Sequence, residues 1–114
     1  NKGERVRSKS EKILADIFYS KGIDYKYECP VNLSNSVRIY PDFTFLHPTS
    51  KKEIYWEHHG MMDDPAYSEE TIRKIRTYEK NGIFVGKNLI ITFETRSQTL
   101  DGEWVEKLIK EHLL

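Results

Sequence analysis

Apolar side chains recur along the chain at two different spacings, which divide it into helices and strands. Residues 8–21 have apolar positions at helical spacing, with Ser8 placed to cap the start and Gly22 following the end. A second helix is expected at residues 68–80, because acidic residues fill its first turn, basic residues its second half, and Asn81-Gly82 can stop it. A third, amphipathic helix is expected from Asp101 to about residue 113.

The remaining apolar stretches are typical of strands. Alternation over residues 25–29 predicts a strand that Pro30 ends, and residues 32–36 have the composition of a turn. Residues 37–46 predict a second strand, in which Pro41 marks a bulge, a bend or an edge because proline cannot donate to a ladder. After the polar turn at residues 47–52, strands are expected at 53–59 and, beyond the loop 63–65, at 88–94.

These elements predict one α/β domain over residues 1–114, in the order α-β-β-β-α-β-α. The formal net charge is zero, with 18 basic and 18 acidic residues, so bulk charge alone would not hold nucleic acid. Cys29 is the one cysteine, which excludes an internal disulfide and a cysteine-built zinc site.

The sequence has no apolar run near the ~20 residues of a membrane span and no signal peptide, so we expect a cytoplasmic protein without a membrane partner. Because the chain begins with Asn1 rather than methionine, we also expect a domain excised from a longer protein.

Three carboxylates stand where acids are unfavourable. Glu11 lies on the apolar stripe of its helix, Asp42 precedes a strongly strand-forming stretch, and Glu57 lies within the strand 53–59. Two of them have an ordinary explanation: Glu11 completes a capping box with Ser8, and aspartates such as Asp42 occur at strand ends. Together, two acids on adjacent strands and one on the preceding helix can bind a hard divalent cation through oxygen ligands, which favours Mg²⁺ or Mn²⁺.

Glu11 on the first helix, Pro41-Asp42 on a strand and Glu57-His58-His59 on the next strand make the sequence similar to the PD-(D/E)XK, or restriction-endonuclease-like, nuclease superfamily. The resemblance covers nearly the whole chain and implies a restriction-endonuclease-like α-β-β-β-α-β core, with a mixed β-sheet flanked by helices. It also implies a metal-dependent nuclease that hydrolyses phosphodiester bonds, with DNA as the favoured substrate, through metal-activated water.

The resemblance implies a role for each site residue. Asp42 and Glu57 would hold the metal, helped by the main-chain carbonyl of His58, and Glu11 would support a second metal or orient water. The lysine of the motif is replaced by His59, which can donate a hydrogen bond to phosphate or transfer a proton near neutral pH.

The role of the missing lysine can also pass to another element. Lys74 is the best candidate, because it shares one face of the 68–80 helix with Tyr67, Thr71 and Tyr78. The ordinary interpretation of Lys74 is a solvated helix lysine.

Two basic clusters and several tyrosines could contact nucleic acid. The clusters are Lys2, Arg5, Arg7, Lys9 and Lys12 near the start, and Arg73, Lys74, Arg76 and Lys80 on the middle helix. Helix-end charge and solubility explain them equally well, and strand packing explains most of Tyr19, Tyr25, Tyr27, Tyr40 and Tyr55. Cutting both strands of a duplex would favour a homodimer or association with other domains of a longer chain.

Three alternatives to an active nuclease remain open. A nuclease-fold module that binds DNA or a protein without cutting is the main one, because the motif lysine is absent. A histidine-rich transition-metal site at His58 and His59 is disfavoured, because strand alternation sends these side chains to opposite faces. An unrelated α/β domain would leave Glu11, Asp42 and Glu57 scattered in space.

Overall fold

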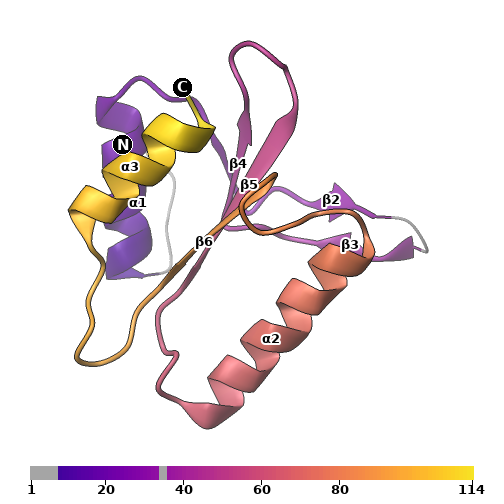
Figure 1. The fold of residues 1–114 in the computed structure, drawn as a ribbon, viewed down its shortest axis with the longest axis vertical. Helices are drawn as coiled ribbons and strands as arrows, with labels where there is room; N and C mark the ends of the chain where they lie inside the picture. Colours follow the sequence, from indigo (N-terminus) through magenta and orange to yellow (C-terminus); the bar gives the residue numbers. More distant parts are fainter. Residues whose placement is uncertain (1–7, 34–35) are drawn as a thin grey trace.

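The computed structural model describes residues 8–33 and 36–114. Within these ranges the chain forms three helices and six strands (Figure 1). In chain order they are α1 (Lys9–Ser20), β1 (Lys26–Tyr27), β2 (Val31–Asn32), β3 (Arg38–Ile39), β4 (Phe43–Leu46), β5 (Glu53–His59), α2 (Pro65–Lys80), β6 (Leu89–Phe93) and α3 (Gly102–His112).

The main sheet is mixed and has the strand order β1-β4-β5-β6. Strand β4 runs antiparallel to β1 and β5, with Phe43 opposite Trp56, whereas β5 and β6 are parallel, with Glu57 opposite Ile91. A parallel pair needs a long crossover connection, which α2 supplies here. The mixed α/β architecture predicted from the sequence is therefore confirmed.

Helices cover both faces of the sheet (Figure 1). On one face, α1 and α3 pack against the sheet, and the fully buried Phe18 makes edge-on ring contacts with Phe43, Phe45 and Trp56. On the other face, Tyr78 of α2 lies in a smaller cluster of apolar side chains that β3 and β6 complete. The sheet thus separates two cores, and a side chain's strand position decides which core it enters.

Each helix begins at a side chain that caps it. The Ser8 hydroxyl accepts the Glu11 amide at 3.1 Å, and Asp101 caps α3 as expected. Helix α2 begins at Pro65 rather than residue 68, because Asp64 accepts the Tyr67 amide and proline suits the first helical position. The expected loop 63–65 is therefore shorter than predicted.

The prediction of one continuous strand over residues 37–46 is wrong. Its first part pairs with β2 as a separate two-stranded sheet, its second part joins the main sheet as β4, and Pro41 lies between them. The expected strand 25–29 pairs only at Lys26–Tyr27. Leu33 donates to the Val37 carbonyl across the expected turn, of which residues 34 and 35 lie outside the described part of the chain.

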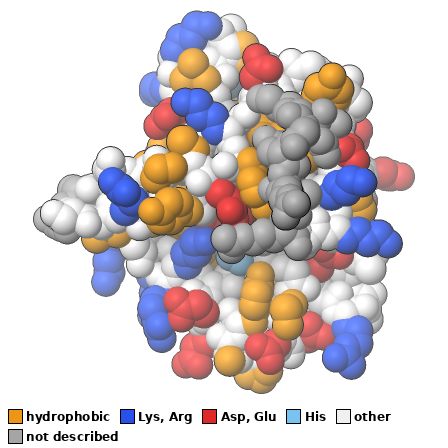
Figure 2. Space-filling view, turned by 180° about the vertical axis from the view of Figure 1, so that it is seen from behind, with side chains coloured by type: hydrophobic (Ala, Val, Ile, Leu, Met, Phe, Trp, Pro, Cys, Tyr) orange, Lys and Arg blue, Asp and Glu red, His pale blue; other side chains and the backbone are white. Residues whose placement is uncertain are grey.

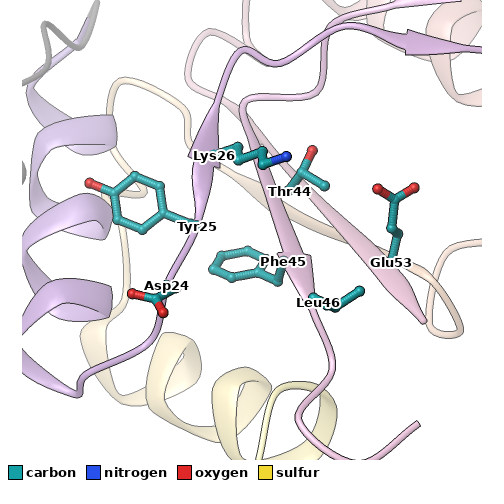
Figure 3. A pocket seen from close by; sticks show the side chains of 7 residues that line it. All are labelled: Asp24, Tyr25, Lys26, Thr44, Phe45, Leu46 and Glu53. Atoms are coloured by element: carbon teal, nitrogen blue, oxygen red, sulfur yellow. The ribbon is translucent and has the colours of Figure 1, made fainter. Parts of the chain in front are cut away.

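A pocket opens beside the outer end of β1 and β4, where Lys26 and Thr44 lie close together and Phe45 forms part of the wall (Figure 3). None of the site residues predicted from the sequence lines it. Within the described ranges, no helix combines the length and apolar character needed to cross a membrane.

Candidate functional site

Glu57 is a carboxylate almost fully removed from solvent, at the centre of a cluster of polar side chains between β5 and α2. Its side chain is 1% exposed. One carboxylate oxygen, Oε1, lies 2.9 Å from Lys74 Nζ and 3.3 Å from His59 Nε2. The other, Oε2, accepts a hydrogen bond from the Tyr78 hydroxyl. A buried carboxylate needs such partners, and here α2 supplies two of the three.

Asp42 lies beside Glu57 on the same face of the sheet. Phe43 is opposite Trp56, so Asp42, one residue before β4, continues the register opposite Glu57. Its Oδ2 accepts the backbone N–H of His58 at 2.7 Å. The structure therefore brings together the two carboxylates that the sequence motif pairs.

Glu11 faces the sheet from α1 and is 9% exposed, which confirms that it lies on the apolar stripe. Its backbone completes the Ser8 cap, while its side chain accepts a hydrogen bond from the Tyr27 hydroxyl at 2.5 Å. The charge of Glu11 also raises the pKa of Asp42, so this third acid belongs to the same electrostatic cluster.

One face of α2 lies over the acids. Lys74 and Tyr78 bind Glu57, and Thr71, one turn earlier, lies 3.4 Å from His59 Nδ1. Tyr67 begins the same face, and its hydroxyl accepts the Gly60 amide at 3.2 Å. The interpretation of Lys74 as a solvated helix lysine is therefore wrong, because its ammonium group pairs with a buried carboxylate.

The acids influence one another's protonation. Burial, and after it the negative charge of Glu57, raise the pKa of Asp42 to about 7, against the lowering effect of the His58 amide. Burial also opposes ionisation of Glu57. The hydrogen bond from His59, the charge of Lys74 and the hydrogen bond from Tyr78 outweigh burial and hold the pKa of Glu57 below its ordinary value. Glu57 is thus the member that is ionised near neutral pH, and Asp42 the one that titrates there.

His58 and His59 point to opposite faces of β5, as strand alternation predicts. His59 faces α2, and its ring stacks on Phe93 with centroids 6.2 Å apart. His58 faces α1, where its Nδ1 lies 2.8 Å from Thr92 Oγ1 and its Nε2 lies 2.6 Å from Glu94 Oε1. The two imidazoles therefore do not share a metal site.

The His58 cluster was not predicted from the sequence. Glu94 also accepts hydrogen bonds from the Ser10 hydroxyl and the Leu100 amide, so it joins α1, β5 and the segment before α3. Burial opposes ionisation of Glu94, but the Ser10 and His58 hydrogen bonds outweigh it and lower the pKa of the carboxyl group. This cluster fixes the position of β5 from the side opposite Glu57.

Within residues 8–33 and 36–114, no three His, Cys, Asp or Glu side chains are grouped so that they could hold a metal ion. Asp42, Glu57 and the main chain offer oxygens at this site, and the metal role predicted for Glu11 stays a prediction. The N–H and C=O of one strand residue point to the same edge, and the His58 N–H binds Asp42. The His58 carbonyl consequently faces the edge of β5 on which Asp42 lies.

Sequence reasoning did not assign the tyrosines that bind these acids. Helical spacing placed Tyr78 on the Lys74 face of α2, but it could not show that this face covers Glu57. Tyr27 gave no such signal, because its contact with Glu11 joins a strand to a helix. Of the basic clusters, Lys2, Arg5 and Arg7 lie outside the described residues, whereas Lys9 and Lys12 are exposed on α1.

No protein-family model matches the sequence. The chain is similar to an uncharacterised protein, MJ1519 of Methanocaldococcus jannaschii, with 36% identity over 88 residues. The similar region covers 75% of this chain and 7% of that protein, so the chain spans only a small part of its relative.

Proposed function

We infer that this chain is a metal-dependent nuclease that hydrolyses phosphodiester bonds, with DNA as the substrate. The observation that carries the proposal is the ion pair of 2.9 Å between Lys74 and Glu57, beside Asp42. It supplies a lysine next to the motif carboxylates although the motif position itself holds His59. A carboxylate pair with an adjacent lysine is the residue set that the PD-(D/E)XK resemblance requires.

The donors suit a hard cation such as Mg²⁺ or Mn²⁺. Asp42, Glu57 and the His58 carbonyl would hold it, and all three offer oxygen atoms. Burial and the repulsion by Glu57 raise the pKa of Asp42, and a cation would relieve that repulsion. When bound, the cation would polarise the scissile phosphate and lower the pKa of a water molecule.

The chain's own residues would orient the substrate and neutralise charge. Lys74, whose side chain is 38% exposed, can reach from Glu57 to a phosphate oxygen. His59 has hydrogen-bonding contacts with Glu57 and Thr71, so it would hold Glu57 in place rather than replace the motif lysine in contact with substrate. Tyr78 would keep Glu57 Oε2 directed toward α2.

The topology supports a restriction-endonuclease-like core. Without β2 and β3, the elements follow the order α-β-β-β-α-β, with three antiparallel strands and a helical crossover to a parallel fourth. In this arrangement β2 and β3 are an insertion between β1 and β4.

DNA contact would have to be local. Figure 2 shows Lys and Arg side chains spread around one face and interspersed with Asp and Glu. The basic residues of α2 other than Lys74 are exposed on its outer surface, where Arg73 pairs with Glu70 at 2.8 Å. With a net charge of zero, affinity for DNA would depend on the site and its immediate surroundings.

A second candidate is a nuclease-fold module that binds DNA or a protein without cutting. Both oxygens of Glu57 already accept from protein donors, which is the observation that favours it. In such a module Lys74 would be the permanent counter-ion of Glu57. The two candidates differ in whether metal binding and cleavage depend on Asp42 and Glu57.

Cleavage of labelled single-stranded, duplex and branched DNA with Mg²⁺ or Mn²⁺ tests the proposal. We expect the wild-type chain to cut at least one form, and Asp42→Asn, Glu57→Gln and Lys74→Met each to lower the rate by ~100-fold or more. Lys80→Met is the matched control, because Lys80 is an exposed lysine on the same helix. It should cut like the wild type.

Absence of cleavage by the wild type, or undiminished cleavage by Asp42→Asn and Glu57→Gln, would overturn the nuclease proposal. DNA binding that is independent of metal and of both acids would instead identify the non-cutting module. Circular dichroism on each variant separates a lost activity from a lost fold.

A further inference from the structure

Strand β6 ends the main sheet with an edge that is partly open. It is the last strand in the order β1-β4-β5-β6, and no strand within the described ranges lies beyond it. Its sequence, Leu-Ile-Ile-Thr-Phe, contains no charged residue and no proline. Natural edge strands are usually very short, charged, interrupted by proline or covered, since an open apolar edge pairs with other chains. The opposite edge of the same sheet, β1, is only two residues long.

The open part of the β6 edge is short and well defined. Asn88 and Glu94 hydrogen bond to β5, so alternation turns the N–H and C=O groups of Ile91 and Phe93 away from β5. At the start of the strand, the Leu89 amide donates to Phe84 and its carbonyl accepts from Gly86, which closes the edge there. A pairing strand can therefore use Ile91 and Phe93 but cannot continue past Leu89.

A groove between this edge and α3 adds an exposed surface beside it. The flank of α3 that faces the groove, called here the α3 flank, consists of Trp104, Lys107, Leu108, Glu111 and His112. Trp104 is 52% exposed although it is a large aromatic residue. Phe93 on the strand is 50% exposed, with its ring on the other face of the sheet, against His59. Figure 1 shows β6 in front of the other strands of the sheet, with α3 to one side.

We propose that two copies of this chain associate through β6, pairing antiparallel about a two-fold axis at Thr92, with their α3 flanks in contact. This register places Ile91 opposite Phe93 of the partner subunit, so the residues with outward-facing backbone groups meet each other. Opposed residues of this kind exchange a pair of hydrogen bonds, and the symmetry repeats the pair. In this register the cross-strand pairing ends before Leu89, whose backbone groups are already hydrogen-bonded. The short open edge can therefore pair with the same edge of a second copy.

The charges of the α3 flank fit a second copy. A two-fold axis perpendicular to the sheet places both α3 helices on the same face and makes them antiparallel. Lys107 and Glu111 lie one turn apart on the flank, so antiparallel contact brings each lysine toward the glutamate of the other copy. Trp104 and Leu108 would supply the apolar centre of that contact. The proposal does not depend on nuclease activity.

Sedimentation velocity across a concentration series tests the association. We expect a reversible dimer, which Phe93→Lys weakens by ~10-fold or more, because it places a charge in both cross-strand pairs. Tyr19→Lys is the matched control, since Tyr19 is an exposed aromatic residue on α1 and should leave the dimer unchanged.

A charge exchange on α3 distinguishes this interface from another mode of association. Lys107→Glu should weaken the dimer, and Lys107→Glu with Glu111→Lys should restore it. Amide hydrogen exchange should show Ile91 and Phe93 protected only in the dimer. A chain that stays monomeric at every concentration, a dimer indifferent to Phe93→Lys, or a double variant without restoration would each overturn the proposal.

Discussion

Asp42 and Glu57 are neighbouring acids with opposite shifts in pKa, and their partners explain the difference. Glu57 is enclosed by donors, including the cation of Lys74, which together outweigh the cost of burial. Asp42 receives one backbone amide and the repulsion of Glu57, so burial dominates and its pKa rises to about 7. Acids whose pKa values are pushed apart in this way are frequent at functional sites.

Replacing Asp42 with Asn should stabilise the metal-free protein. The raised pKa means that ionised Asp42 destabilises the fold: the cost is absent below about 3.8, grows as the pH rises toward about 7, and is complete above it. Asparagine keeps an acceptor for the His58 amide and removes the charge. We expect a gain on the order of 2 kcal/mol above neutrality, after allowing for solvent screening.

Urea denaturation of wild type and Asp42→Asn at several pH values measures this effect. The two proteins should have the same free energy of unfolding in acid and diverge as the pH rises. A constant difference at every pH would show that ionisation of Asp42 is not the cause.

Replacing Lys74 with Met should have the opposite effect on stability. The lowered pKa of Glu57 means that its ionised form stabilises the fold above its ordinary pKa of 4.5, and this stabilisation is lost as the pH falls through the lower folded value. Removing the ammonium group leaves the buried carboxylate with only His59 and Tyr78. We expect a loss of ~1–3 kcal/mol near neutrality that shrinks in acid.

Thermal denaturation at neutral and acidic pH, with Lys80→Met as the control, tests the Lys74 prediction. Adding Glu57→Gln should remove much of the penalty, because the charge that Lys74 balances is then absent. Equal losses for Lys74→Met and Lys80→Met would contradict the role of the ion pair.

At the scale of elements, α2 packs on the sheet through apolar contacts and also makes polar contacts with the acids of the site. Tyr78 lies in the apolar cluster with Tyr55 and Leu89, yet its hydroxyl binds Glu57. Burial and the charge of Glu57 both raise the pKa of Tyr78, so the phenol stays protonated and remains a donor. Tyr78, a residue of the apolar cluster, therefore holds α2 in position over the site.

Tyr78→Phe tests this anchoring with almost no change of shape. The substitution leaves Glu57 Oε2 without its buried donor, and we expect a loss of ~1–3 kcal/mol in the free energy of unfolding. Tyr19→Phe, at an exposed position, should change stability by less than ~0.5 kcal/mol. The denaturant midpoints of the two variants give the comparison, and similar midpoints would show that the hydroxyl contributes little.

The sequence predicted elements well where local signals and tertiary contacts agree. Strand β5 has the predicted bounds, because its apolar and aromatic residues suit a buried central strand. The α2 start was misplaced although Asp64-Pro65 is a strong helix-start signal. The β2–β3 pair was missed because two-residue strands have no periodicity to detect.

The site was predicted only in part, because some of its contacts depend on tertiary structure rather than on local sequence. Glu57 and Asp42 could be paired from the strand order and the motif, whereas the contact of Lys74 with Glu57 depends on how α2 crosses the sheet. Helical periodicity placed Lys74, Thr71 and Tyr78 on one face but could not show what that face covers. The His58–Glu94 cluster joins strands β5 and the end of β6, and no local pattern predicts such a contact.

At the scale of the whole molecule, each face of the sheet has an apolar core and a cluster of polar side chains beside it. Helices α1 and α3 enclose aromatic residues on one side, while α2 covers Glu57 and His59 on the other. Glu94 contacts His58 of β5 on the α1 side, opposite Glu57. Under the nuclease proposal, a cation at Asp42 and Glu57 would relieve the repulsion between these two acids.

A divalent cation should consequently stabilise the entire fold, and more strongly as the pH rises. Ligand that binds only the folded chain adds about 2.7 kcal/mol at a concentration of 100 Kd. Protons compete for Asp42 until the pH exceeds its pKa of about 7, so the increase in melting temperature with Mn²⁺ should be small near pH 6 and larger near pH 8. Asp42→Asn and Glu57→Gln should remove the effect, whereas Lys80→Met should keep it. Calorimetry at both pH values measures the proton release directly, and a stabilisation that ignores pH and both acids would place the cation elsewhere.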